Sequence, residues 1–141
     1  MLISMIKTYS ELQRLNTLKD RFDYLKVNGI VCEETFYGSR FLNQRFYNTP
    51  EWKQIRNFVI RRDNGCEMGL DGYYIPGFIV IHHINPITKE DLLNDVQKCL
   101  DPEFLVCVSS AMHKAIHYSD DSIIELVKGV NRSPNDTTLW R

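Results

Sequence analysis

Four histidines occur in this chain, and all of them lie in two short clusters, His82-His83 and His113-x-x-x-His117. Neighbouring residues on a β-strand point to opposite faces, so His82 and His83 cannot serve the same site. Histidines four residues apart on a helix share a face and can hold one ion together. The spacing therefore predicts a metal site made by His82, His113 and His117. It leaves His83 as a separate base, and it requires a fold in which the two clusters meet.

Composition places the chain in the class of ordinary globular domains. It has 141 residues, of which 43% are hydrophobic and 25% charged, values typical of one soluble domain with a core. No apolar run approaches the roughly 18 residues that a membrane span needs, and the N-terminus lacks the features of a secretory signal. The four cysteines include no C-x-x-C pair, which favours reduced thiols over a disulfide framework. We therefore expect a cytoplasmic protein without a membrane partner.

The charge pattern is uneven although the formal net charge is only −1. The segment before the first histidines is basic, whereas residues 67–110 carry more acidic than basic side chains. An acidic neighbourhood suits a cation site, and a basic flank could hold phosphate. The alternative is that these charges are the solvated faces of helices, and charge alone favours that alternative.

The first part of the sequence predicts helices separated by an aromatic segment. Residues 8–28 have helical patterning in two pieces, the first capped by Ser10 and the second by Asn16 or Thr17. Residues 30–48 are aromatic and irregular, which indicates an extended arm or loop. Thr49-Pro50-Glu51 then predicts the start of a helix that runs to about residue 62.

The second part predicts an α+β arrangement. The expected elements are a short hairpin or two linked strands over 73–75 and 78–82, a helix over 89–99, a strand over 103–108, and helices over 111–118 and 120–128. Two strands followed by a helix can bring the two histidine clusters to one point. The expected organisation is N-terminal helices and an aromatic arm over 1–48, a metal-binding domain over 49–128 and an extended tail over 129–141.

Such a cluster has a definite chemistry. Three neutral imidazoles hold a divalent ion and leave coordination positions for substrate or water. A phosphodiester is a natural substrate, since a metal can polarise a phosphoryl oxygen while a nearby histidine takes a proton from water. His83 is the candidate for this base, because an unperturbed imidazole is mostly neutral at pH 7. A hydrogen bond to its other ring nitrogen would fix the tautomer, and the sequence does not identify the partner.

The residues around the first cluster resemble a known family. The segment His82-His83-Ile84-Asn85-Pro86 resembles the core of the HNH endonucleases, which is His-His-Ile-x-Pro or Asp-His-Ile-x-Pro. The preceding helix and turn, Trp52 to Cys66, and the closing segment, Asp101 to Tyr118, agree with the family pattern, so the resemblance covers about residues 45–118. In particular the chain resembles small HNH proteins of tailed bacteriophages. The resemblance implies a ββα-metal (His-Me finger) core and metal-dependent cleavage of DNA in the cytoplasm of a bacterial host.

Matched position by position, the resemblance implies the same roles for the histidines. His82 matches a metal ligand and His83 the general base, while His113 and His117 match the two helix ligands of colicin-type HNH nucleases. The resemblance also places basic side chains where they could contact the phosphate backbone of DNA: Arg56, Arg61, Arg62 and Lys114.

The chain departs from the family pattern in three ways. Of the four cysteines that hold a structural zinc in many HNH proteins, only Cys66 is present; Ser109 and Met112 stand where the second pair would be. We therefore expect no structural zinc ribbon, so packing must replace it. The central Asn of the family is Phe104 here, with Asn85 and Asn94 as nearby substitutes. The net charge of −1 is low for an indiscriminate nuclease.

Two functions are compatible with this pattern. The first is a phage-encoded, metal-dependent HNH endonuclease that acts on DNA with one divalent ion, Mg²⁺, Mn²⁺, Ni²⁺ or Zn²⁺. The second is a catalytically weak or inactive protein on the same scaffold that binds a phage or host protein, as a host-defence antagonist or a phage-assembly factor. The tail and the aromatic arm could wrap a partner or a second copy, or could pack across their own core; the arm carries Phe36, Tyr37, Phe41, Phe46 and Tyr47.

Overall fold

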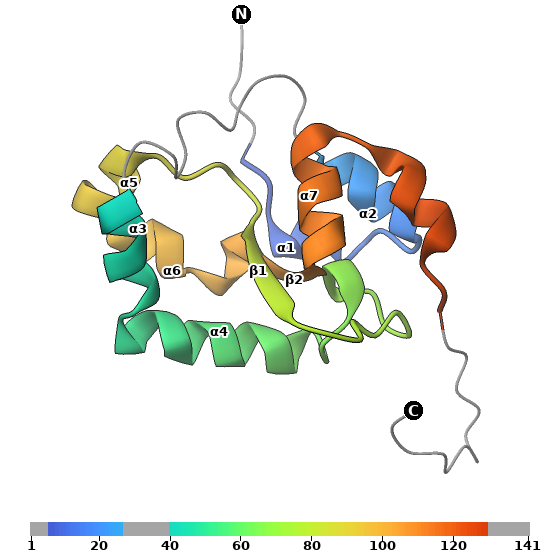
Figure 1. Cartoon of the computed structure of the whole chain (residues 1–141), viewed down its shortest axis with the longest axis horizontal. Helices are drawn as coiled ribbons and strands as arrows, with labels where there is room; N and C mark the ends of the chain where they lie inside the picture. The colour runs from blue at the N-terminus through green and yellow to red at the C-terminus, as the bar shows by residue number, and fades with distance from the viewer. Residues whose placement is uncertain (1–5, 27–39, 130–141) are drawn as a thin grey trace, which may run out of the picture.

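The structure is a computed structural model that describes residues 6–26 and 40–129 (Figure 1). In chain order the elements are α1 (Tyr9–Leu12), α2 (Leu18–Leu25), α3 (Arg40–Tyr47), α4 (Pro50–Arg62), the 3₁₀ helix η2 (Glu67–Gly69), β1 (Ile79–His83), α5 (Lys89–Asn94), α6 (Val96–Leu100), the 3₁₀ helix η3 (Pro102–Phe104), β2 (Leu105–Ser109), α7 (Ser110–Tyr118) and the 3₁₀ helix η4 (Asp121–Leu126). Within the described ranges, no helix has both the length and the apolar character that crossing a membrane requires.

The centre of the fold is a two-stranded antiparallel sheet, and the α+β expectation is confirmed at this level. β1 pairs with β2 in a register that runs from Ile79 opposite Ser109 to His83 opposite Leu105. Side chains alternate between the two faces of a strand. His82 therefore shares one face with Val80, and His83 shares the other face with Ile81.

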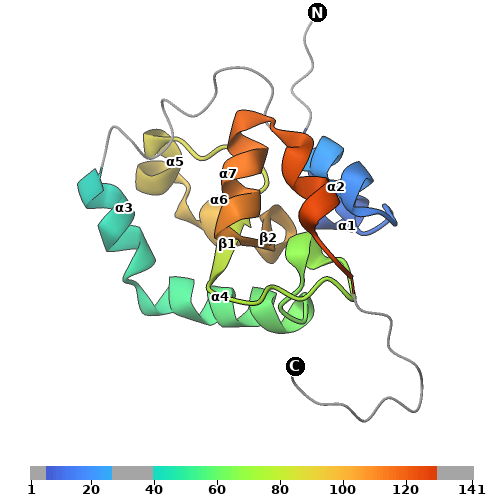
Figure 2. The same ribbon diagram turned by 45° about the vertical axis from the view of Figure 1, so that its right-hand side comes forward.

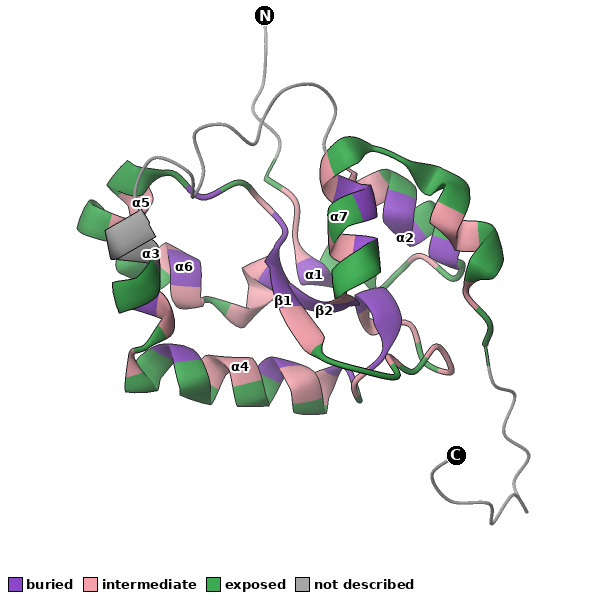
Figure 3. Cartoon of the chain, in the orientation of Figure 1, coloured by how far each residue is buried: buried purple, intermediate pink, exposed green. Residues whose placement is uncertain are grey.

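Each face of the sheet is covered by its own hydrophobic cluster. The cluster on the His82 face contains residues of the N-terminal helices, η2, β2 and α7, and Ile84 directly after β1: Tyr9, Leu12, Leu18, Phe22, Leu25, Met68, Ile84, Val106, Val108, Met112, Ala115 and Ile116. The cluster on the His83 face combines residues of α3, α4, α6 and the strands: Phe46, Trp52, Val59, Ile81, Ile87, Cys99, Leu105 and Cys107. Figures 1 and 2 show α4 on one side of the sheet and α7 on the other. Burial is densest in β2 and the second half of β1 (Figure 3), so the histidine pair lies where the sheet is covered on both faces.

Local capping explains most of the helix starts. Thr17, Thr49 and Ser109 each accept a hydrogen bond from a backbone N–H of the first helical turn. The sequence predicts the helix starts at Thr17 and Thr49. Thr88 and Asp91 form a reciprocal capping box at the start of α5. α1 differs from the prediction: its cap is Thr8, because the Ser10 hydroxyl and amide donate to the carboxylate of Glu103 instead.

Three predicted elements are corrected by the structure. The arm expected over residues 30–48 is helical over Arg40–Tyr47, because the Phe46 ring is buried against Trp52 with ring centroids 5.2 Å apart. The strand expected over 73–75 is a single bridge between Tyr74 and Cys66, not half of a hairpin with β1. The helix expected over 120–128 is the shorter 3₁₀ helix η4.

Other predictions hold only in part. The helix expected over 89–99 is divided into α5 and α6, since Asp95 leaves the helical conformation with φ −144° and ψ 57°. Within the predicted arm, Phe36 and Tyr37 lie outside the described residues, as do the side chain of Phe41 and the tail beyond residue 129.

The N-terminal helices α1 and α2 share a hydrophobic cluster with the strands and α7, so they pack on the same core as the predicted metal-binding segment.

The end of α4 is joined to the sheet by hydrogen bonds that the adjacent, ion-paired residues Arg62 and Asp63 make with β2. The Arg62 Nε lies 2.9 Å from Oδ1 of Asp63, whose side chain is fully buried. Arg62 also donates to the carbonyls of Pro102 and Leu105 at 2.7 and 2.6 Å, and its guanidinium lies 3.4 Å from the centre of the Tyr9 ring. The other carboxylate oxygen of Asp63 accepts the backbone N–H of Cys107 at 3.0 Å. Arg62 therefore links α1, α4, η3 and β2.

Replacing Arg62 is expected to destabilise the protein strongly. Arg62→Met leaves the Asp63 carboxylate buried without its partner, and this should lower the free energy of unfolding by about 3 kcal/mol. Denaturation by urea, followed by circular dichroism, measures the change. The control is Arg61→Met at the preceding, exposed position of the same helix. This substitution should change the free energy of unfolding by no more than about 0.5 kcal/mol. Equal midpoints for the two variants would contradict this role of Arg62.

Candidate metal centre

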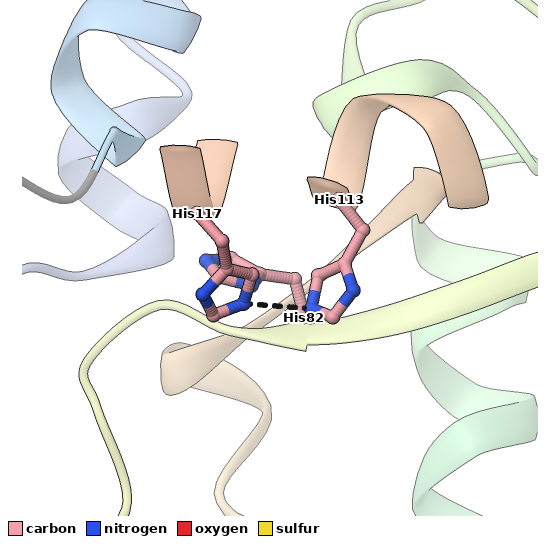
Figure 4. Close-up of side chains that lie close together, drawn as sticks. All are labelled: His82, His113 and His117. Carbon is pink, nitrogen blue, oxygen red and sulfur yellow. Dashed lines mark hydrogen bonds between the residues drawn. The ribbon is translucent and has the colours of Figure 1, made fainter. Parts of the chain in front are cut away.

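Three imidazole rings meet between β1 and α7 (Figure 4). His82, His113 and His117 each offer a ring nitrogen, and these three nitrogens lie within 4.8 Å of one another. The ring centroids are 5.2 Å apart for His82 and His113, 5.4 Å for His82 and His117, and 4.5 Å for His113 and His117. The predicted ligand set is therefore brought together, and the cluster could hold a metal ion.

The local sequence explains why the rings meet. His82 lies on the face of β1 that is covered by α7, opposite Val106 of β2. β2 continues into α7 without an intervening loop, since Ser109 ends the strand and caps the helix. His113 and His117 are one helical turn apart and share the side of α7 that faces β1. A strand, a direct connection and a nine-residue helix are thus enough to assemble the site.

The polar atoms of His82 favour a bound ion. The side chain is 3% exposed, and neither ring nitrogen has a hydrogen-bond partner in the part of the chain that the structure describes. A buried polar group without a partner costs on the order of 1–3 kcal/mol. A metal ion held with His113 and His117 would satisfy one of these nitrogens, so the residues present fit a metal.

The spacing of the other two ligands fits a coordination shell. Nε2 of His113 lies 3.0 Å from Nε2 of His117. Two nitrogens bound to one ion at about 2.0–2.1 Å lie about 2.8–3.4 Å apart when the angle between them at the ion is about 90–110°. Without an ion, one of the two nitrogens has to donate a hydrogen to the other. With an ion, both present lone pairs to it.

Burial keeps the cluster neutral, which metal binding requires. The pKa of His82 is well below 6.5 because of burial and the neighbouring His113 and His117. Burial, with a contribution from His117, lowers the pKa of His113 to about 4, and burial also lowers the pKa of His117. At pH 7 all three imidazole rings are therefore neutral, and each has one nitrogen whose lone pair can bind a metal ion.

His83 lies on the opposite face of the sheet and does not point into the cluster. Its Nε2 is 3.1 Å from the carbonyl oxygen of Cys99; a carbonyl only accepts, so Nε2 carries the hydrogen and Nδ1 is the basic nitrogen. The ring stacks on Trp52 with centroids 5.5 Å apart and an interplanar angle of 22°. Burial lowers the pKa of His83 to about 4. The backbone carbonyl of Cys99 is thus the partner that fixes the tautomer of His83. The sequence could not identify this partner, because every residue type has a backbone carbonyl.

The lowered pKa values predict a pH-dependent stability. Between pH 4 and 6.5 the unfolded chain binds more protons than the folded chain, so the free energy of unfolding should fall as the pH decreases through this window. For His83, with a pKa of about 4 against 6.5 when unfolded, the loss between pH 7 and pH 5 is about 2 kcal/mol at about 1.4 kcal/mol per pKa unit. Urea denaturation of the metal-free protein at both pH values measures it. His83→Gln should have a smaller difference between the two pH values; an unchanged difference would exclude His83 as a source.

The predicted DNA contacts have different environments. Arg61 and Lys114 are exposed, and Arg56 is half-buried with its guanidinium 5.3 Å from the centre of the Phe78 ring. The hydrogen bonds of Arg62, by contrast, are made to protein groups. These contacts hold Arg62 within the fold, and its predicted contact with DNA stays a prediction.

The position of the missing Asn has a backbone role. The carbonyl of Phe104 accepts the N–H of Ile84 at 2.8 Å, so residue 104 holds the chain directly after His83 through its main chain. The side-chain amide of Asn85 donates to the carbonyl of Lys7 and accepts its N–H, both at 2.9 Å. Asn94 is exposed at the end of α5.

Lys7 is a neighbour of the cluster that sequence reasoning missed. The two hydrogen bonds to Asn85 hold its backbone beside the chain that follows β1, and its charge contributes to the low pKa of His82. Burial lowers the pKa of Lys7 itself. Nothing in the local sequence connects a residue near the N-terminus with a strand so far along the chain.

Comparison of the chain with protein-family models, with curated proteins and with solved structures found no match.

Proposed function

We propose that this chain is a metal-dependent endonuclease of the HNH type, with a ββα-metal core, that hydrolyses phosphodiester bonds of DNA. One observation carries the proposal: three buried or half-buried imidazoles converge between β1 and α7, while the next residue on the strand is a neutral histidine whose tautomer is fixed by a carbonyl. A ligand set and an oriented base are the two parts that such hydrolysis requires.

The proposed metal ligands and the proposed base lie on opposite faces of the sheet, and each has its own role. His82, His113 and His117 would hold the ion, which supplies charge stabilisation at the phosphoryl group and the leaving oxygen. His83 would accept the proton of the attacking water at Nδ1, since Nε2 donates to the Cys99 carbonyl. Arg56, Arg61 and Lys114 would contact the phosphate backbone. Each such contact adds affinity that weakens with salt.

The ligand chemistry narrows the choice of metal. An all-imidazole set suits Zn²⁺, Ni²⁺ and other later transition metals better than Mg²⁺, which prefers oxygen ligands. Oxygen atoms of the DNA phosphate would complete the coordination shell and could accommodate Mg²⁺ or Mn²⁺. One ion is expected for each chain. The proposed setting is the cytoplasm of a bacterial host infected by a tailed phage that encodes the protein.

A cleavage assay tests this proposal. Supercoiled and linear DNA are incubated with the protein and, separately, with Mg²⁺, Mn²⁺, Ni²⁺ and Zn²⁺, beside His113→Ala. Cleavage that requires one of these metals and the intact cluster is the expected result. A wild-type protein that binds metal but cuts no DNA with any of the four ions would rule out the nuclease.

A second candidate is a metal-holding protein without catalytic activity that binds a phage or host protein. The observation in its favour is the environment of His83, which is 9% exposed beneath Trp52, whereas a base has to reach the attacking water. Phe46 and Tyr47 also lie beside this ring, with centroids at 6.3 and 6.5 Å. On this alternative the metal stabilises the fold, and metal binding without cleavage is the result that supports it.

A further inference from the structure

The geometry of the cluster depends on one connection, the point where β2 becomes α7. Ser109 pairs with Ile79 at the end of the sheet and also caps the helix through its hydroxyl, which accepts the Met112 N–H at 3.0 Å. His113 and His117 are four and eight residues further on, about 6 and 12 Å along the helix axis at 1.5 Å per residue. The third ligand, His82, belongs to the other strand.

Small changes in the direction of α7 would therefore disrupt the site. A tilt of about 10° at Ser109 moves His113 by about 1 Å and His117 by about 2 Å relative to His82, given the 1.5 Å rise per residue. Metal–ligand distances tolerate deviations of about 0.2 Å. Precise binding thus requires that the start of α7 is held by something besides the peptide bond to β2.

Besides the packing of Met112, Ala115 and Ile116 in the core, the side chain of Glu67 contacts the start of α7 directly. Its Oε1 accepts the backbone N–H of Ser109 at 2.7 Å. Burial raises the pKa of Glu67, and hydrogen bonds from Ser109 offset part of this increase. The side chain is 5% exposed, in a position where an unpaired carboxylate would be costly. A carboxylate at this position is also favoured by the positive end of the helix dipole of α7.

Glu67 is itself held firmly. Its N–H donates to the Tyr73 carbonyl at 2.7 Å, and the neighbouring Met68 is fully buried in the same hydrophobic cluster as Met112 of α7. The carbonyl of Met68 accepts a hydrogen bond from the guanidinium of Arg21 at 2.8 Å. The turn that presents Glu67 is therefore anchored to α2, to the sheet and to α7.

We propose that Glu67 is a positioning residue for the histidine cluster: by accepting the Ser109 N–H it sets the direction in which α7 leaves the sheet, and so it controls metal affinity without touching the metal. The inference rests on the metal-binding part of the proposed function and not on DNA hydrolysis. A residue that does not bind the metal but orients its ligands typically contributes 10–100-fold to metal affinity.

Titration of the full-length protein with Co²⁺, followed by its visible absorption, and with Zn²⁺ by calorimetry tests the proposal. Glu67→Ala should bind one ion about 10–100-fold more weakly than wild type and change the Co²⁺ spectrum. Glu67→Gln keeps an acceptor oxygen of the same reach, so its affinity should stay within about threefold of wild type, well short of that loss. Val59→Ala is the matched control, because Val59 is fully buried on the opposite face of the sheet and should lower stability without changing metal affinity.

The possible outcomes separate the two claims. If wild type binds Co²⁺ or Zn²⁺ and Glu67→Ala binds equally well, the role of Glu67 is wrong and the ligand set stands. If wild type binds neither ion, the ligand set and the role of Glu67 are both overturned. Should Glu67→Ala not fold, Glu67→Asp decides: it keeps the charge but is one methylene too short, and wild-type affinity in that variant overturns the proposal. Equal weakening by Glu67→Gln and Glu67→Ala also overturns it.

Discussion

Zn²⁺ or Co²⁺ is expected to raise the free energy of unfolding by about 4 kcal/mol when the free ion is at a thousand times its dissociation constant, because the ion binds the folded chain and not the unfolded one. The three ligands come from two segments that meet only in the folded protein. In addition, the ion satisfies a buried ring nitrogen of His82 that has no hydrogen-bond partner within the described ranges. Thermal denaturation with increasing metal measures the effect.

Two variants of α7 control this experiment. His113→Ala removes one ligand and should abolish most of the metal-dependent stabilisation. Lys114→Ala changes the adjacent, exposed residue and should respond to metal as wild type does. If His113→Ala is stabilised by metal as much as Lys114→Ala, then the ligand assignment fails.

Removal of the base should have the second large effect. If His83 accepts the proton of the attacking water, His83→Ala should lower the rate of DNA cleavage by about 10²–10⁴-fold, the usual contribution of a positioned general base. Metal affinity should change little, since His83 lies on the opposite face of the sheet from the ligands. Cleavage rates with metal in excess, measured beside a metal titration, separate the two effects.

A second substitution distinguishes catalysis from packing. His83→Ala also opens space beside Trp52 and leaves the Cys99 carbonyl without its donor. His83→Gln keeps an amide N–H at about the reach of Nε2 that can donate to that carbonyl, but it has no basic nitrogen. Both variants should be inactive on the proposed mechanism. Activity in His83→Gln close to that of wild type would show that His83 is structural.

The elements best predicted from the sequence were those whose signal is local. Thr49 and Thr88 specify helix starts within one turn, and the capping hydrogen bonds are present in the structure. The i, i+4 spacing of His113 and His117 fixes a shared helix face regardless of what surrounds the helix. Alternation along the strand likewise separates His82 from His83.

Errors arose where distant contacts override a local preference. The aromatic segment ending at Tyr47 is partly helical because Phe46 is buried against Trp52 and the His83 face of the sheet. Ser10 is not a cap because Glu103 takes its hydrogen bonds.

The sequence by itself determined which residues could be ligands and that His82 and His83 serve different faces, because both follow from residue spacing and backbone periodicity. Only the tertiary structure decided how the ligands are held and what surrounds the base. The Glu67–Ser109 hydrogen bond, the Cys99 carbonyl at His83 and Lys7 near His82 all join segments far apart in the chain. Such contacts depend on how the sheet, α7 and the N-terminal segment pack, and that packing is a property of the whole core and not of any local pattern.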